Sequence, residues 1–459
     1  MARAFSICIT LLLALGAASP APRIACVIAG NGGAPRLTFP DDNAYPALLG
    51  RMVGTDVHPL IVRFDRGSAG ALGEISRFAP GVVFLEPCVA WNMGPGDSAR
   101  CRESLLPLVE SLGRLDGSPR VVILLPPPVA GVQGESDSTL AGRVLPLLRE
   151  IAWLTACEVV DSYSLFRDHA GYFSDRGRAS PRAQEVIARR LAGLLRMEEV
   201  PGFNIISRTG IRGELGNFFG YECTKFTFRE REARIVRPKR PAPGCPWIWR
   251  ARFWGHEPQT EIALLERGFH VVYCDASELF GNDEAVALWD SFYVMLRGAG
   301  LAPKAALEGL SRGGVYIYRW AVHAPDRVAC VYADAPVLDF RSWPGGRGKG
   351  GGNPEEWERF KKDFALGSEA AALAFRGNPI DLAGEIARGG YPMLHVCGLA
   401  DVVVPFEENT EPFARSIVRY GGTISVITKP GIGHHPHSLP NPAPIVRFIL
   451  RATGQPLDE

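Results

Sequence analysis

The sequence feature that most constrains this chain is a serine set between glycines, in the stretch G-L-S-R-G-G at residues 309–314. An apolar run precedes the stretch, and a helical pattern over residues 315–324 follows it. A strand, a tight turn and a helix in this order hold a serine in a strained backbone conformation with its hydroxyl exposed. Small neighbours matter because bulkier side chains would clash at so sharp a turn. The pattern therefore predicts that Ser311 is a nucleophile.

A serine hydroxyl is a weak nucleophile at neutral pH, so it needs a general base, and the base needs an orienting carboxylate. In chains with this elbow, the acid and then the histidine follow the serine. The predicted acid is Asp401, in the loop after an apolar strand-like run. Asp334 and Asp339, which follow an earlier predicted strand, are the alternatives.

The predicted base is His434, directly after a glycine in the loop that follows the last predicted strand, with His435 as the alternative. Together with His437, these histidines also suggest a metal site. No second cluster of carboxylates and histidines lies nearby in the sequence, which argues against a metal. We therefore expect no metal and no other cofactor.

The negative charge that develops on a substrate carbonyl oxygen needs two backbone N–H donors. The amide of Arg312, directly after the nucleophile, is the first candidate donor. The second is the amide of Phe253 or Trp254, in the loop after a predicted strand. The guanidinium of Arg312 is a further candidate contact for the oxyanion or for a substrate carboxylate. The alternative is a solvated arginine at the start of a helix.

Length and charge limit the class of protein. A chain of 459 residues is too long for one compact core, which predicts two domains. The formal net charge is +1, so no basic excess indicates nucleic acid or an anionic membrane surface as a partner. Residues 1–19 combine an arginine, a short apolar run and small residues, as in a signal peptide. We expect a secreted or periplasmic protein with no membrane segment after removal of the signal.

The chain has ten cysteines but no C-x-x-C pair, which argues against a structural zinc site. Export would permit disulfides. The pairs Cys88–Cys101 and Cys223–Cys245 lie closest in sequence, and each is a candidate bond. Cysteines inside apolar strand-like runs are expected to be buried free thiols: Cys26, Cys274, Cys330 and Cys397.

Two units of alternating strands and helices are predicted, over residues 20–200 and 201–459, and both belong to the α/β class. In the first unit, the alternation predicts a parallel sheet covered on both faces. The second unit begins with an antiparallel hairpin, predicted over residues 223–228 and 231–236. Strands joined by helices follow, which predicts an open, mostly parallel sheet that binds ligands at the carboxyl ends of its strands.

The second unit resembles an α/β-hydrolase, on the elbow at Ser311, the Asp401 loop and the Gly433-His434 pair. The resemblance implies a sheet with helices on both faces and a Ser–His–Asp triad. The arginine directly after the nucleophile resembles the Ser-Arg step of bacterial glucuronoyl esterases and related carbohydrate esterases. This second resemblance implies an ester of a carbohydrate as the substrate.

The first unit resembles the GDSL/SGNH esterase fold, a three-layer α/β/α domain. Residues 23–31 and 65–70 are similar to its first and second motif blocks. Gly32 stands where the nucleophilic serine belongs, residues 88–91 replace the block that carries an asparagine, and Ser180 stands where a histidine is expected. The resemblance implies a non-catalytic domain that packs on the hydrolase or binds glycan.

These observations together predict a secreted serine esterase that hydrolyses a carbohydrate ester through an acyl-enzyme on Ser311. The ester is either an acyl group on a sugar or an alkyl ester of a uronic acid. Two tryptophans in loops near the predicted site, Trp254 and Trp343, are candidate platforms for a sugar ring. His256 is a further candidate substrate contact.

Two other functions stay open. A serine peptidase of the prolyl-oligopeptidase kind shares the fold and the order of the triad. That kind usually carries a propeller ahead of the hydrolase domain, whereas this chain shows no blade repeats. The other function is glycan binding by two inactive esterase folds, against which an intact triad argues. The sequence carries no signal for an oligomeric state.

Overall fold

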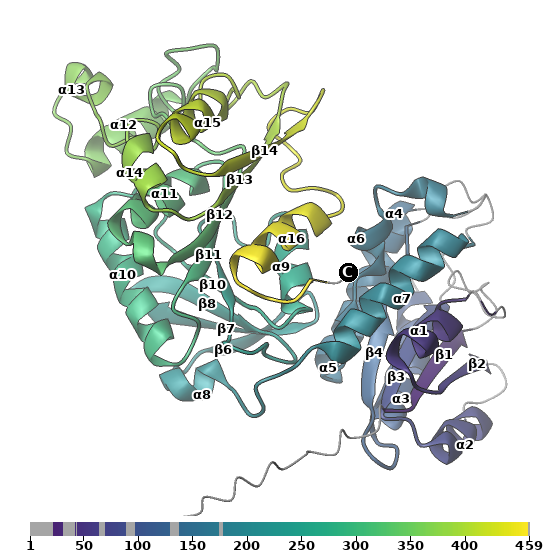
Figure 1. Ribbon diagram of the computed structural model, residues 1–459. Helices are drawn as coiled ribbons and strands as arrows, with labels where there is room; N and C mark the ends of the chain where they lie inside the picture. Colours follow the sequence, from purple (N-terminus) through teal and green to yellow (C-terminus); the bar gives the residue numbers. More distant parts are fainter. Residues whose placement is uncertain are drawn as a thin grey trace, which may run out of the picture.

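Two sheets, each with helices on both faces, make up the described part of the chain (Figure 1). The computed structural model describes residues 22–30, 42, 44–63, 69–88, 97–128, 137–173 and 178–457. The signal peptide predicted over residues 1–19 lies outside this part. Within these ranges, every helix is too short or too polar to cross a bilayer.

The first sheet has five parallel strands in the order β2-β1-β3-β4-β5. Their bounds are β1 (Ile24–Gly30), β2 (Val57–Arg63), β3 (Val82–Cys88), β4 (Arg120–Leu124) and β5 (Glu158–Val160). Successive side chains of a strand point to opposite faces of the sheet. In β1, Cys26 accordingly joins one hydrophobic core and Val27 the other.

Helices enclose both of these cores. α1 and α7 pack on the face that carries Cys26, and α2, α3 and α5 on the face that carries Val27. The helical segments are α1 (Tyr45–Val53), α2 (Ala69–Phe78), α3 (Asp97–Gly113), α4 (Asp137–Thr139), a π-helical turn (Leu140–Val144), α5 (Leu145–Leu154), α6 (Ser162–Phe166), a 3-10 turn (Ala170–Tyr172) and α7 (Pro181–Arg196). The predicted α/β/α layering of this unit is confirmed.

The resemblance of this unit to the GDSL/SGNH fold stays a prediction. Residues 31–32, 65–68 and 89–91, which carry much of it, lie outside the described ranges. Ser180 is described, and it caps helix α7, because its hydroxyl accepts a hydrogen bond from the Ala183 amide at 3.3 Å. The serine at this position therefore has a structural role.

The second sheet has nine strands in the order β14-β13-β12-β11-β9-β10-β8-β7-β6. β6, β7, β8 and β10 pair in antiparallel fashion, and β10 to β14 run parallel to β9. The bounds are β6 (Glu214–Phe218), β7 (Tyr221–Phe228), β8 (Arg231–Arg237), β9 (Trp247–Arg250), β10 (His270–Cys274), β11 (Ala305–Leu310), β12 (Val328–Asp334), β13 (Met393–Gly398) and β14 (Ile424–Lys429). The predicted hairpin is β7–β8, and the predicted α/β-hydrolase fold is confirmed.

Helices α8, α10, α11, α14 and α15 cover one face of this sheet, and α9 and α16 cover the face turned toward the first unit (Figure 1). The helical segments are α8 (Ile205–Thr209), α9 (Gln259–Leu265), α10 (Asp283–Gly298), α11 (Gly313–His323), a 3-10 turn (Pro325–Arg327), α12 (Pro354–Asp363), α13 (Glu369–Leu373), α14 (Ala383–Arg388), α15 (Thr410–Arg419) and α16 (Ala443–Ala452). α12 and α13 pack with the loop after β12 around a separate aromatic cluster.

The predicted disulfides are wrong, because Cys101, Cys223 and Cys245 are all free thiols. Cys223 and Cys245 belong to the hydrophobic cores on opposite faces of the second sheet, so their side chains cannot meet. The four cysteines predicted to be buried free thiols are free and buried, as expected.

A buried ion pair and a buried hydrogen bond join the two units. Glu266, directly after α9, accepts hydrogen bonds at 2.8 Å from the guanidinium of Arg190 and from the amide of Asp161. The Asp161 carboxylate in turn binds Arg149 at 2.7 Å. Burial raises the pKa of Glu266, and the charge of Arg190 opposes that rise. Because a charge left alone at such a depth is costly, each group depends on its partner.

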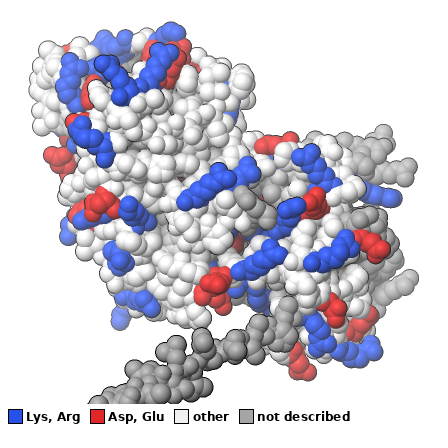
Figure 2. Space-filling view, viewed as in Figure 1, with Lys and Arg blue, Asp and Glu red and all other residues white. Residues whose placement is uncertain are grey.

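Basic side chains gather along the boundary between the two units on the face shown in Figure 2. A cavity of about 490 Å³ lies at this boundary. Its lining includes four arginines: Arg189, Arg190, Arg196 and Arg267.

We predict that Glu266→Ala lowers the free energy of unfolding by about 3 kcal/mol, because it removes the buried carboxylate shared by Arg190 and Asp161. Urea denaturation followed by circular dichroism measures the change. Glu185→Ala is the control, since Glu185 forms an exposed pair with Arg189 and its loss should cost less than about 1 kcal/mol. Equal stability of the two variants would contradict this account of the interface.

Candidate active site

Ser311 lies in a sharp turn between β11 and α11, where its φ angle is +49°. Such a conformation is unfavourable for a residue with a side chain, so the surrounding structure must hold it. The Ser311 amide donates to the Asp334 carbonyl at 2.8 Å, and its carbonyl accepts from the Val337 amide at 3.0 Å. A Cβ atom at Gly309 would lie 2.6 Å from the backbone of Gly313, which explains the glycine.

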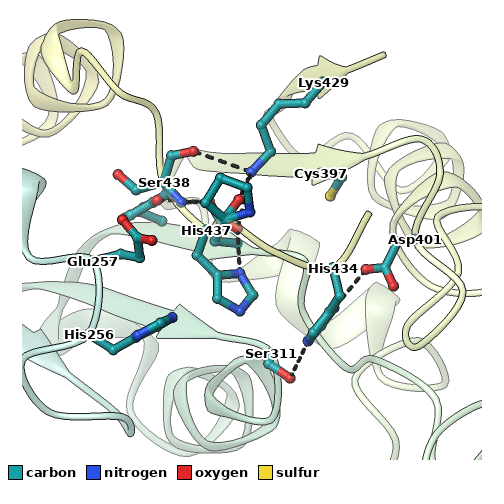
Figure 3. Close-up of polar contacts among 12 residues, drawn as sticks. His256, Glu257, Ser311, Cys397, Asp401, Lys429, His434, His437 and Ser438 are labelled. Atoms are coloured by element: carbon teal, nitrogen blue, oxygen red, sulfur yellow. Dashed lines mark hydrogen bonds and ion pairs between the residues drawn. The ribbon is translucent and has the colours of Figure 1, made fainter. Parts of the chain in front are cut away.

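The structure brings Ser311, His434 and Asp401 together from three loops at the carboxyl edge of the sheet (Figure 3). Nε2 of His434 lies 3.0 Å from Oγ of Ser311. Nδ1 of His434 lies 2.7 Å from a carboxylate oxygen of Asp401. This is the arrangement in which a histidine accepts the serine proton while the carboxylate orients the ring.

Backbone amides hold the Asp401 carboxylate in place. Its second oxygen accepts hydrogen bonds at 2.8 Å from the amides of Val403 and Val404. Burial raises the pKa of this carboxyl, but the hydrogen bonds from His434 and from the two amides outweigh burial, and the net pKa lies below its usual range. Asp401 is therefore ionised at neutral pH.

The loops that carry Asp401 and His434 touch closely. The Ala400 amide donates to the Ile432 carbonyl at 2.9 Å. A Cβ atom at Gly398, the last residue of β13, would lie 2.2 Å from the Gly433 carbonyl oxygen. Only glycine permits this approach, which brings the carboxylate within reach of the histidine ring.

The amides of Arg312 and Phe253 have no protein partner within the part of the chain that the structure describes. Arg312 is the N-cap residue of α11, where backbone N–H groups are left without helical partners. Phe253 lies in the loop after β9 with a φ of +53°. A Cβ atom at Gly313, in the first turn of α11, would lie 3.9 Å from the backbone nitrogen of Arg252, so the loop that carries Phe253 passes beside the start of α11.

Arg250, the last residue of β9, fixes the loop that carries Phe253. Its guanidinium is completely buried and donates to the backbone carbonyls of Arg252, Phe253 and His256 at 2.8, 2.9 and 2.6 Å. The sequence did not reveal the role of Arg250, because its partners lie in the loop after β9, in α9 and in β11 and meet it only in the folded chain.

Two carboxylates compensate the charge of Arg250: Glu261 in α9 at 2.5 Å, and Glu308 in β11 at 3.1 Å. Burial and the neighbouring Glu261 raise the pKa of Glu308 well above its usual range, against the attraction of Arg250. Because Glu308 lies three residues before Ser311, one buried arginine connects the nucleophile's strand to the Phe253 loop.

The guanidinium of Arg312 is held by neighbouring side chains. It pairs with Glu356 at 2.8 Å and lies 5.3 Å from the ring centre of Trp343, with Phe253 and Phe280 each at 5.9 Å. That it contacts the oxyanion or a substrate carboxylate stays a prediction. The alternative of a solvated side chain is wrong, since the side chain is 17% exposed.

The two tryptophans predicted to contact the substrate differ in exposure. Trp343 is 9% exposed and packs against Phe280 and the Arg312 guanidinium. Trp254 is partly exposed and packs against Phe218, with ring centres 4.8 Å apart, and against further groups from β8 and β10. That these two residues contact the substrate stays a prediction.

His256 is exposed and lies beside two histidines of the loop that carries His434. Its ring centre is 5.7 Å from that of His435 and 5.9 Å from that of His437. Burial lowers the pKa of His256, and the charges of His437 and Arg250 add to this effect against the attraction of Glu257. His256 thus lies beside the loop that carries His434, and its role as a substrate contact stays a prediction.

A second histidine–aspartate pair lies next to the first. Asp334, an alternative for the acid, accepts a hydrogen bond from Nδ1 of His437 at 2.8 Å. The amide of Ser438 and the hydroxyl of Tyr332 also donate to it, at 2.8 and 3.0 Å. The pattern H-P-H-S directly after His434 was the only sequence signal for this pair.

No protein-family model and no curated protein matches this chain. Solved structures similar to it include acylaminoacyl peptidase from Pyrococcus horikoshii (TM-score 0.38, 15% identity) and dipeptidyl peptidase 4 from Porphyromonas gingivalis (TM-score 0.39, 17% identity). These matches cover 47% and 51% of this chain but only 38% and 35% of the other two. This chain thus spans well under half the length of either peptidase.

The fold and the site make the chain a serine hydrolase. The Ser-Arg step predicted a carbohydrate esterase, and this prediction is wrong. The solved structures similar to this chain are named as peptidases, which agrees better with the peptidase alternative.

We predict that Arg250→Lys lowers kcat for a p-nitrophenyl ester by about 100-fold, because a lysine cannot hold three carbonyls and two carboxylates at once. Steady-state kinetics on protein verified as folded by circular dichroism measures the effect. The control is Arg327→Lys, since Arg327 pairs with Asp290 outside the site and should tolerate the change. An Arg250→Lys enzyme with the kcat of the wild type would contradict the role of Arg250.

Proposed function

We propose that this chain is a serine peptidase in which Ser311 is the nucleophile, His434 the general base and Asp401 the group that orients the histidine. The observation that carries the proposal is the continuous line of hydrogen bonds from Asp401 through His434 to Ser311. Two amides without protein partners, those of Arg312 and Phe253, support it as donors to an oxyanion.

The wall beside the nucleophile favours a peptide over a sugar as the substrate. It combines an arginine–glutamate pair, Arg312 and Glu356, with the partly exposed ring of Phe253, whereas the neighbouring rings of Phe280 and Trp343 are buried. A peptide offers apolar side chains together with amide donors and carbonyl acceptors, which suit mixed aromatic and polar surroundings. The unit ahead of the hydrolase is an α/β domain rather than a propeller, so access to the site would differ from that in prolyl-oligopeptidases.

The reaction would proceed in two acyl-transfer steps. Oγ of Ser311 attacks the scissile carbonyl carbon while Nε2 of His434 takes its proton. The oxyanion receives hydrogen bonds from the amides of Arg312 and Phe253. The tetrahedral intermediate collapses as His434 returns the proton to the leaving amine, and the C–N bond breaks. Water, deprotonated by His434, then releases the acyl group from Ser311 as a carboxylic acid.

A substrate panel tests the proposal. We expect the wild type to cleave blocked and unblocked peptide p-nitroanilides and p-nitrophenyl esters, and to release no acetate from acetylated xylan. Ser311→Ala should lower kcat by at least about 10³-fold on every substrate that is cleaved. Cleavage of esters alone would contradict the peptidase proposal while leaving the serine hydrolase intact. Undiminished turnover by Ser311→Ala would contradict the assignment of the nucleophile.

We further predict that Asp401→Asn lowers kcat by about 10⁴-fold, because an amide favours the wrong tautomer of His434. Steady-state kinetics from pH 6 to 9 measures the loss, which should persist at every pH. Asp339→Asn is the control, since Asp339 binds the neighbouring Arg341 instead of a histidine of the site. A kcat of Asp401→Asn close to that of the control would assign the orienting role to another group.

A further inference from the structure

Three histidines outside the triad converge beside it. His256 comes from the loop after β9, and His435 and His437 come from the loop after β14. One ring nitrogen of each lies within 4.8 Å of one nitrogen of each other histidine. Figure 3 shows the rings of His256 and His437 directed toward one another next to Ser311. Two loops that are distant in sequence therefore bring three imidazole rings close together.

Asp334 holds His437 in the state that a metal requires. Nδ1 of His437 donates to this carboxylate at 2.8 Å, which leaves Nε2 with its lone pair free to coordinate. His437 is 3% exposed and Asp334 is fully buried, so the ring has one orientation. A carboxylate behind a ligating histidine is the usual second partner in metal sites, because it fixes the ring and strengthens its basicity.

Lys429 fixes the backbone around His437. Its ammonium group donates to the carbonyls of Pro436 and Ser438 at 2.6 and 3.2 Å (Figure 3). The loop is thus rigid at His437, whereas His256 and His435 are exposed and can rotate about their side-chain bonds. Nitrogen ligands at about 2.0–2.1 Å from a tetrahedral ion lie about 3.3 Å apart. Zinc binding would therefore require the two exposed rings to rotate until their nitrogens lie this close to the nitrogen of His437.

We propose that His256, His435 and His437 bind one Zn²⁺ ion, with water in the fourth position. Three imidazoles and an open position are a donor set typical of zinc, whereas ions that prefer oxygen ligands, such as Mg²⁺ and Ca²⁺, fit it less well. The ion would tie the loop that carries Phe253 to the loop that carries His434. This inference is independent of the peptide substrate, because it concerns binding alone.

Equilibrium dialysis against Zn²⁺, followed by elemental analysis of the intact Ser311→Ala protein, tests the proposal. We expect one Zn²⁺ per chain, and a melting temperature that rises with Zn²⁺ concentration since the ion binds the folded state. His256→Ala and His435→Ala should each weaken binding by at least about tenfold. Both positions are exposed, so the variants should fold.

Two controls make the outcome specific. His323→Ala removes another exposed histidine, paired with Asp290, and should bind Zn²⁺ like the parent protein. Mg²⁺, which prefers oxygen ligands, should neither bind nor raise the melting temperature. The proposal is overturned if the parent protein binds no Zn²⁺, or if the His256→Ala and His435→Ala variants bind it as tightly as His323→Ala does. Loss of peptidase activity alone would not bear on it.

Discussion

The guanidinium of Arg250 lies fully buried beneath the site, where it joins three elements of the second sheet and its helices. It contacts Glu308 in the nucleophile's strand, Glu261 in α9 and the carbonyls of the loop that carries Phe253. Removal of a guanidinium from water is costly, and only a full set of partners offsets that cost. Movement of the loop would break the hydrogen bonds of a buried charge, which accounts for a rigid loop at Phe253.

A second buried charge supports the histidine loop in a similar way. Asp334 ends β12, and its carbonyl binds the Ser311 amide while its carboxylate binds His437 and the Ser438 amide. Asp334 therefore positions both the turn that carries Ser311 and the loop that carries His434. The relative position of the nucleophile and the base follows from backbone groups at strand ends, which are the most rigid points that an open sheet offers.

The elbow, the order of acid and base, and both sheets could be predicted because their signals are local: glycines beside a serine, and apolar runs of strand length. Arg250 and the Asp334–His437 pair could not, since their partners lie up to 103 residues apart and depend on strand order. The Ser-Arg step misled the choice of substrate for the same reason. A dipeptide does not reveal that Glu356 and three aromatic rings enclose the arginine.

The most direct measurement is the rate and position of labelling by a fluorophosphonate, with the adduct mapped by mass spectrometry. The account predicts a single adduct on Ser311, formed at least about 10³-fold more slowly in His434→Ala than in the wild type. An adduct on another serine, or an unchanged rate in His434→Ala, would contradict the claim that this elbow holds an activated nucleophile.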